Sequence, residues 1–144
     1  MNKIDLKSNL KAEIGSENSE CYLVIYDFVR FSDDSSVMFK INIQNSVFGI
    51  HNFKFFAGIN SFKLFLGKVE SIFGNLNGKA EILVDYEKSY IMFEGKNNGH
   101  IDIITEVHLY DGTDQMANVQ IIIDQTFLPS FIKSLKQIYK DLNF

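Results

Sequence analysis

Tryptophan is absent from this chain of 144 residues, and cysteine and proline occur once each. The single cysteine, Cys21, excludes a framework of internal disulfides and favours a reducing compartment. No run approaches the roughly 20 apolar residues of a membrane-spanning helix, and the charged first residues lack the apolar core of a signal peptide. We therefore expect a cytoplasmic protein with no membrane partner.

Basic residues are scarce in one part of the chain. Residues 79–124 hold three Lys against nine Asp or Glu, a balance of −6, whereas the formal charge of the whole chain is −4. Proteins that bind nucleic acids need clustered cations to neutralise phosphates. The charge pattern therefore disfavours a nucleic-acid partner and fits a basic protein partner.

Motifs of catalysis and of metal or cofactor binding are also missing. The sequence has no GxSxG nucleophile motif, no P-loop and no dinucleotide-binding glycine motif. The segment His100–His108 places two His and two carboxylates on one side of a predicted strand. Its two ends lie on the order of 26 Å apart at the strand rise, which is too far for both His to share one metal. We expect no metal, no cofactor and no enzymatic activity.

Aromatic residues, in contrast, are plentiful, with 14 Phe and 6 Tyr. Buried aromatic side chains remove large areas from water, so this content predicts an aromatic core. The length fits a single domain over residues 1–144, in which residues 1–19 form a loose arm or a short strand.

Six segments have the apolar pattern of β-strands: 21–31, 37–43, 79–86, 89–95, 100–110 and 115–124. Segment 21–31 is apolar at both alternating sets of positions, as in a strand with both faces covered. Short polar turns separate the last four segments, which predicts an antiparallel arrangement. Segment 44–58 stays open between a strand and a loop.

Two further segments, 59–76 and 126–142, repeat apolar residues at the 3.6-residue period of a helix. Asn60 or Ser61 is predicted to cap the first helix, and Pro129 fits the first turn of the second, where its missing N–H costs no hydrogen bond. The element order ββ(β)αββββα predicts an α+β fold: a six- or seven-stranded, mainly antiparallel sheet with two amphipathic helices packed on one face.

The last four predicted strands separate an apolar side from a mixed side. Inward positions on the last two of them are predicted to be Ile101, Ile103, Val107, Leu109, Ala117, Val119, Ile121 and Ile123. The opposite side mixes carboxylates with Tyr, Met, Leu and Ile, a composition typical of protein interfaces. A solvated face, or one covered by another part of the chain, stays open as the alternative. We predict a partner-binding face formed by Glu81, Asp85, Tyr90, Glu94, Asp102, Ile104, Glu106, His108, Tyr110 and Ile122.

Two segments carry a resemblance to a known family. The strand start GHIDI at residues 99–103 and the strand-to-helix run IIIDQTFLPSFIKSL at residues 121–135 resemble a family of small bacterial proteins that is similar to the WapI-like immunity proteins of contact-dependent toxin loci. The resemblance covers about residues 37–142. It implies the order strands, helix, strands, helix and a non-catalytic protein that binds and neutralises a cognate toxin domain. With the acidic middle segment, it favours a basic toxin domain, such as a nuclease, as the partner.

Two other classes of function stay open from the sequence. A homo-oligomeric structural or scaffold protein would use the same face between copies of the chain. A small-molecule-binding or enzymatic domain would instead need a pocket between the sheet and the helices that holds convergent polar or ionisable groups.

Overall fold

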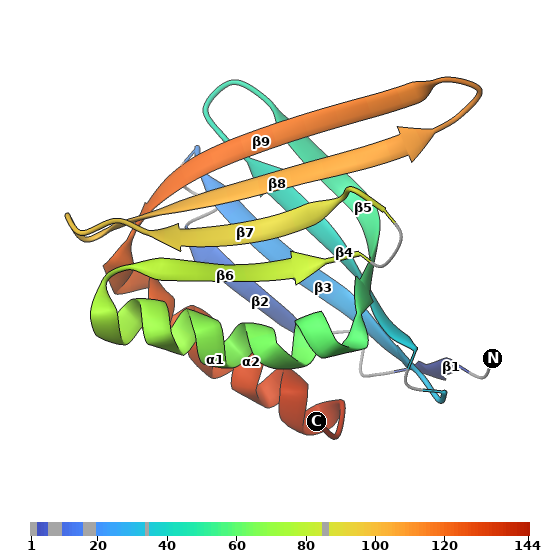
Figure 1. Cartoon of the computed structure of the whole chain (residues 1–144), viewed down its shortest axis with the longest axis horizontal. Helices are drawn as coiled ribbons and strands as arrows, with labels where there is room; N and C mark the ends of the chain where they lie inside the picture. Colours follow the sequence, from blue (N-terminus) through green and yellow to red (C-terminus); the bar gives the residue numbers. More distant parts are fainter. Residues whose placement is uncertain (1–2, 6–9, 16–19, 34, 85–86) are drawn as a thin grey trace.

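The computed structural model describes residues 3–5, 10–15, 20–33, 35–84 and 87–144. Within these residues the chain forms nine strands, two α-helices and a short 3-10 turn (Figure 1). The elements are β1 Lys3–Asp5, β2 Lys11–Gly15, β3 Tyr22–Phe31, β4 Ser36–Gln44, β5 Gly49–Gly58, α1 Ile59–Asn75, β6 Gly78–Leu83, β7 Tyr90–Gly95, β8 His100–Tyr110, β9 Asp114–Asp124, η1 Gln125–Phe127 and α2 Leu128–Asp141.

The first sheet contains β1 to β5. Strands β3, β4 and β5 are consecutive antiparallel neighbours, while β2 and β1 pair with the first and second halves of β3. Segment 44–58 is therefore the turn after β4 followed by strand β5. Asn45 holds this turn, because its side-chain Oδ1 accepts hydrogen bonds from the backbone N–H groups of Val47 and Phe48 at 2.8 and 2.9 Å.

Strand β3 contains a bulge that accounts for part of its apolar pattern. Asp27 has a φ of 55°, and the register with β4 shifts between Tyr26 and Val29. Because the extra residue exchanges the two sides of the strand, Leu23 faces the core before the bulge and Phe28 faces it afterwards. Val24 and Val29, on the other side, are also buried, so the apolar pattern reflects both a change of side and burial on both faces.

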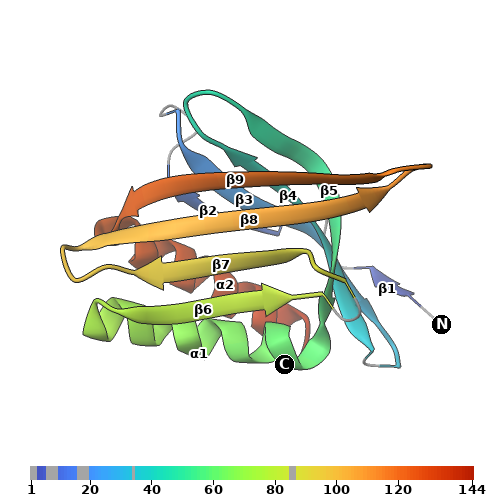
Figure 2. The same cartoon turned by 45° about the horizontal axis from the view of Figure 1, so that its top comes forward.

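The second sheet contains β6 to β9 in sequence order, and each consecutive pair is antiparallel. The α+β class, the antiparallel pairing and the two helices are confirmed. The sequence predicted a single sheet of six or seven strands, whereas the structure has two sheets. Helix α1 follows β5, and β6 then starts the second sheet. Figure 2 shows the strands of the second sheet crossing those of the first.

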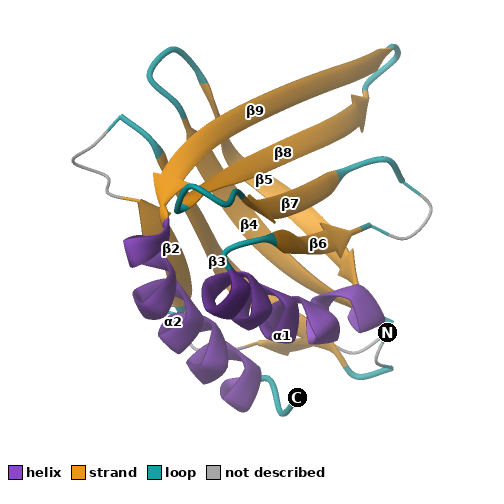
Figure 3. Ribbon diagram, turned by 60° about the vertical axis from the view of Figure 1, so that its left-hand side comes forward, coloured by secondary structure: helices purple, strands orange, loops and turns teal. Residues whose placement is uncertain are grey.

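The two helices lie side by side, with α1 along β6 and α2 along β2 (Figure 3). Side chains from both sheets and both helices form one apolar cluster. Its aromatic members stack across elements: the rings of Phe62 in α1 and Tyr139 in α2 are 4.8 Å apart, and those of Phe93 in β7 and Phe131 in α2 are 5.3 Å apart. The expected aromatic core is therefore present.

Ser61 does not cap α1, and the predicted capping by Asn60 or Ser61 is wrong. The helix begins at Ile59 without a side-chain cap. The Ser61 hydroxyl instead accepts a hydrogen bond from the Leu83 N–H at 2.8 Å and donates one to the Glu81 carbonyl at 3.3 Å. Helix α1 thereby occupies the outer edge of β6.

The hairpin of β8 and β9 extends beyond the rest of the sheet. The pairing of β7 with β8 begins at Tyr90 and Glu106, so β8 continues past the start of β7 (Figure 1). Leu109 is 53% exposed and Ala117 is also exposed, although both occupy inward positions. Their predicted burial is wrong, because the hairpin leaves the core before its alternation ends.

Candidate functional site

The predicted face residues come together on one side of the second sheet. Every one that the structure describes lies on the side opposite the core, and Asp85 lies outside the described residues. Figures 1 and 2 show no described element in front of this side. We call it the outer face, and it consists of Lys79, Glu81, Leu83, Tyr90, Met92, Glu94, His100, Asp102, Ile104, Glu106, His108, Tyr110, Asp114, Met116, Asn118, Gln120, Ile122 and Asp124.

The strand register arranges these side chains in rows across the sheet, and neighbours in a row lie about 5 Å apart. One row joins Glu94, Asp102 and Ile122. The next row joins Glu81 to Ile104 through Met92. A third row joins Leu83, Tyr90, Glu106 and Asn118.

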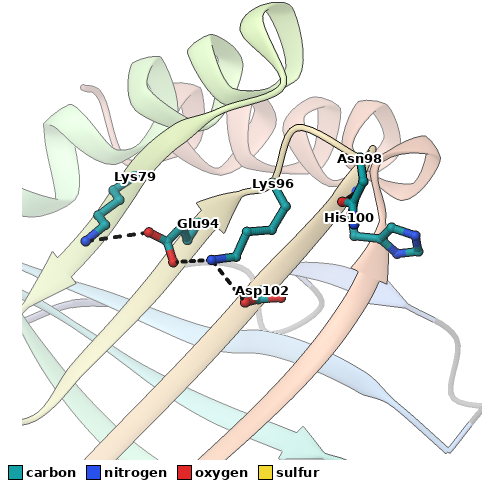
Figure 4. Close-up of polar contacts among 6 residues, drawn as sticks. All are labelled: Lys79, Glu94, Lys96, Asn98, His100 and Asp102. Atoms are coloured by element: carbon teal, nitrogen blue, oxygen red, sulfur yellow. Dashed lines mark hydrogen bonds and ion pairs between the residues drawn. The ribbon is translucent and has the colours of Figure 1, made fainter.

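Two lysines neutralise part of the acidic charge at one end of the outer face (Figure 4). Lys96 Nζ lies 2.9 Å from Glu94 Oε1 and 3.6 Å from Asp102 Oδ2, and Lys79 Nζ lies 3.6 Å from Glu94 Oε2. The hydrogen bond from Lys96 holds the pKa of Glu94 below its usual value, and the same bond raises the pKa of Lys96. Glu94 and Asp102 therefore contribute less negative potential than their sequence suggests.

Glu106 is held by partners on both of its carboxylate oxygens. His108 Nε2 lies 2.8 Å from Oε2, and Asn118 Nδ2 donates to Oε1 at 3.2 Å. These two hydrogen bonds lower the pKa of Glu106, with the His108 bond as the larger cause. The backbone N–H of His108 in turn donates to Ser89 Oγ at 2.9 Å. The carboxylate is thus held in position where the pairing of β7 with β8 begins.

Apolar side chains occupy the rest of the outer face. Met92 and Ile104 are half-buried cross-strand neighbours near its centre, and Ile122, at its rim, is 61% exposed. Tyr110 and Met116, on the projecting hairpin, are 73% and 61% exposed. An uncovered group of apolar side chains with charges around it is typical of a protein-binding surface.

Sequence reasoning missed several members of this face. Met116 shares its parity with Asn118 and was identifiable from the alternation of the last strand alone. Lys79 shares its parity with Glu81 in the same way. Lys96 lies in the turn between β7 and β8, and no periodicity places a turn side chain beside a strand face.

The small-molecule alternative requires a pocket between the sheet and the helices. One hollow of about 490 Å³ lies instead at the projecting hairpin and shares residues with the outer face; its ionisable lining residues are Glu87, Lys88, His108, Tyr110 and Asp114. Another of about 410 Å³ lies between the two helices, with lining residues that include Phe73 and Ile132. Among the residues that the structure describes, no three His, Cys, Asp or Glu side chains are grouped closely enough to hold a metal ion.

Comparisons with known proteins complete the description. Neither helix in the described part of the chain is long and apolar enough to cross a membrane. No curated protein matches the sequence. The fold is similar to that in a structure of the plant transcriptional regulator PBF-2: the match covers 99% of this chain and 85% of that chain, with a TM-score of 0.52 and 9% sequence identity. A model of the immunity protein WapI-like family matches residues 11–143, so the resemblance found in the sequence is confirmed and the chain belongs to this family.

Proposed function

We propose that this protein acts by binding and neutralising a cognate toxin domain, without catalysis, and that the outer face of β6 to β9 is its contact surface. The observation that carries the proposal is the composition of this face, in which half-buried Met92 and Ile104 lie among carboxylates and no described element covers them. Membership of an immunity protein family supports a protein partner.

The charge of the outer face favours a basic toxin domain. It carries six carboxylates, and Lys79 and Lys96 form ion pairs only with the two at one end. Among the described residues, no lysine forms an ion pair with Glu81, Glu106 or Asp114, so negative charge remains on the rest of the face, reduced near Glu106 by the charge of Lys88. A negative surface accelerates association with a basic partner and suppresses wrong partners.

Charge reversal tests the proposed face. The variant Glu81→Lys/Glu106→Lys keeps the core residues unchanged, so we expect it to fold and to bind the cognate toxin domain at least about tenfold more weakly. Its affinity should also depend less on salt concentration, because the attraction that salt screens is removed. Isothermal titration calorimetry at several salt concentrations measures both effects.

A matched control distinguishes the effect of the outer-face residues from the effect of the protein's net charge. Glu20→Lys/Glu70→Lys changes the total charge by the same amount at exposed positions away from the outer face. Its binding should stay close to that of the unaltered protein. Equal losses in both double variants, or full affinity in the face variant, would refute the outer face as the contact surface.

A homo-oligomer that uses the same face is the second candidate, favoured by the uncovered Ile104. Light scattering of the unaltered chain and of Ile104→Asp distinguishes it from toxin binding. A dimer that becomes a monomer in the variant would assign the face to a second copy of the chain.

A further inference from the structure

We infer that the free edge of β9 at Asp114–Asn118 binds an extended segment of the toxin domain as an additional strand of the second sheet. The inference rests on the proposed function and adds to it the mode of recognition and the chemistry of the bound segment. It is argued from the backbone N–H and C=O groups of β9, whereas the proposed contact surface is argued from the side chains of the outer face.

The second sheet has one closed edge and one open edge. On β6 the Ser61 hydroxyl of α1 bonds the N–H of Leu83 and the carbonyl of Glu81, so backbone groups at that edge are already paired. On β9 the strand order ends: no described strand is hydrogen-bonded to it on the side away from β8, and strands of the first sheet cross behind it (Figure 2). A strand can therefore be added only next to β9.

Two contacts identify which backbone groups of β9 point to the open edge. The N–H of Gln125 donates to Gly99 O at 3.0 Å, which continues the ladder with β8, so odd-numbered residues of β9 bond β8. The carbonyl of Gln120 points the other way, because it accepts from the Asn45 side chain at 3.5 Å. In an antiparallel strand the N–H and C=O of one residue point to the same side. Asp114, Met116 and Asn118 therefore direct their backbone N–H and C=O groups toward the open edge.

The turn between β4 and β5 limits the length of the open edge. Its Asn45 side chain reaches β9 at Gln120. Beyond that contact, residues 111–118 are all exposed, because the hairpin extends past β7 and the core. Five residues of edge, Asp114–Asn118, are enough for a short added strand.

The β9 edge lacks the features that normally prevent strand pairing. Edge strands are commonly protected by Lys, Pro or bulges. Strand β9 has the sequence DQMANVQIIID, without Lys or Pro, and its register with β8 has no shift. The edge strand of the first sheet, β5, contains Lys54, and its register with β4 shifts between Ile41 and Ile43. The two edges therefore differ in a way that favours strand addition at β9.

The charge of the hairpin favours a basic toxin segment over a second copy of this chain. The hairpin, residues 106–118, carries Glu106, Asp111 and Asp114 and has no Lys or Arg. Pairing of two β9 strands would bring two such acidic hairpins together. The exposed Leu109 and Ala117 on the other side leave apolar surface uncovered. The fitting segment is extended, with Lys or Arg on the outer side and apolar residues on the inner side.

Proline at position 116 tests the edge with little damage to the hairpin. Because the Met116 N–H points away from β8, Met116→Pro removes no bond of the existing ladder. Met116→Ala is the matched control, because it removes the same outer-face side chain but keeps the N–H. We expect Met116→Pro to bind the cognate toxin domain at least about tenfold more weakly than Met116→Ala. If circular dichroism shows that Met116→Pro does not fold, Asn118→Pro and Asn118→Ala provide the same comparison at the next outward-pointing N–H.

Amide hydrogen exchange of the unaltered protein gives a second readout. The N–H groups of Met116 and Asn118 should exchange rapidly in the free protein and become protected in the complex. Those of Gln115 and Ala117, which face β8, should be protected in both. Exchange at Met116 and Asn118 that stays rapid in the complex would overturn strand addition.

The outcomes separate this inference from the proposed function. Full affinity of both proline variants with weakened Glu81→Lys/Glu106→Lys would overturn strand addition and leave the face proposal standing. Proline variants that bind more weakly than their alanine counterparts, with full affinity of that double variant, would support the edge and refute the contact surface centred on Glu81 and Glu106. A dimer of the unaltered protein that Met116→Pro converts to a monomer would assign the edge to a second copy and overturn the inference. Absence of any binding by the unaltered protein would overturn both.

Discussion

The inner side of the second sheet contains a buried hydroxyl whose removal we expect to stabilise the protein. Thr105 of β8 is 0% exposed, and its Oγ1 has no hydrogen-bond partner among the described residues. Its cross-strand neighbours, Ile91 of β7 and Val119 of β9, are each 1% exposed. The hydroxyl therefore lies between apolar side chains in the core.

Thr105→Val replaces the hydroxyl with a methyl group and keeps the branched shape of the side chain, so the rotamer is undisturbed. A buried hydroxyl without a partner costs about 1–3 kcal/mol relative to its hydrated state. Because no hydrogen bond is lost with it, we expect the free energy of unfolding to rise by about 1–2 kcal/mol. For a chain of this length that corresponds to a melting temperature higher by about 3–8 °C.

Thermal unfolding followed by circular dichroism, together with urea unfolding at 25 °C, measures this change. Thr105→Ser is the control, since it keeps the hydroxyl and removes the methyl group, which should cost about 1 kcal/mol. A Val variant that melts at or below the temperature of the unaltered protein would refute the reasoning, because the hydroxyl would then make a stabilising hydrogen bond.

Two glycines and one carboxylate give the remaining predictions. Gly95→Ala should lower the free energy of unfolding by about 1–3 kcal/mol in urea titrations, because an added Cβ would lie 2.9 Å from Ile72 Cγ2 at the end of α1; a neutral result would mean that α1 shifts freely. Gly67→Ala, where the added Cβ meets no atom within 4 Å, should instead raise it by about 0.5–1 kcal/mol, and a loss there would contradict the open environment of that position. Because the hydrogen bonds from His108 and Asn118 lower the folded-state pKa of Glu106, they stabilise the fold at neutral pH, and this contribution is lost as pH falls below the ordinary pKa of 4.5. The difference in urea midpoint between the unaltered protein and Glu106→Gln should therefore shrink between pH 6 and about pH 3, and a constant difference would exclude ionisation as its source.

The alternation of residues along β6 to β9 was enough to predict which side chains share the outer face. Side chains alternate along a strand with a period of two, and the apolar set marks the core side of each strand. Glu94 of β7 and Asp102 and Ile104 of β8 therefore fall opposite the core without knowledge of the strand register. The same reasoning failed for Leu109, because a period says which side a residue takes and not whether a core lies beneath that side.

Features that depend on contacts between distant segments could not be predicted in the same way. The bulge at Asp27 changes the side of later residues in β3, and a single extra residue leaves the apolar composition of the segment unchanged. The division into two sheets places α1, not β5, along the outer edge of β6, where Ser61 bonds Leu83 across 22 residues of sequence, and no local pattern predicts that contact. The neutralisation of Glu94 by Lys96 depends on the path of a turn.

The alternation within β6 to β9 also has an evolutionary consequence. Residues that hold the fold, such as Ile103 and Phe93, and residues proposed to select the partner, such as Ile104 and Met92, are adjacent in sequence and lie on opposite sides of one sheet. Because substitutions on an exposed strand side usually change stability by less than about 0.5 kcal/mol, the outer side can diversify while the core stays constant. If the proposed function holds, one scaffold of this kind can be adapted to many different toxin domains without a separate search for a stable fold each time.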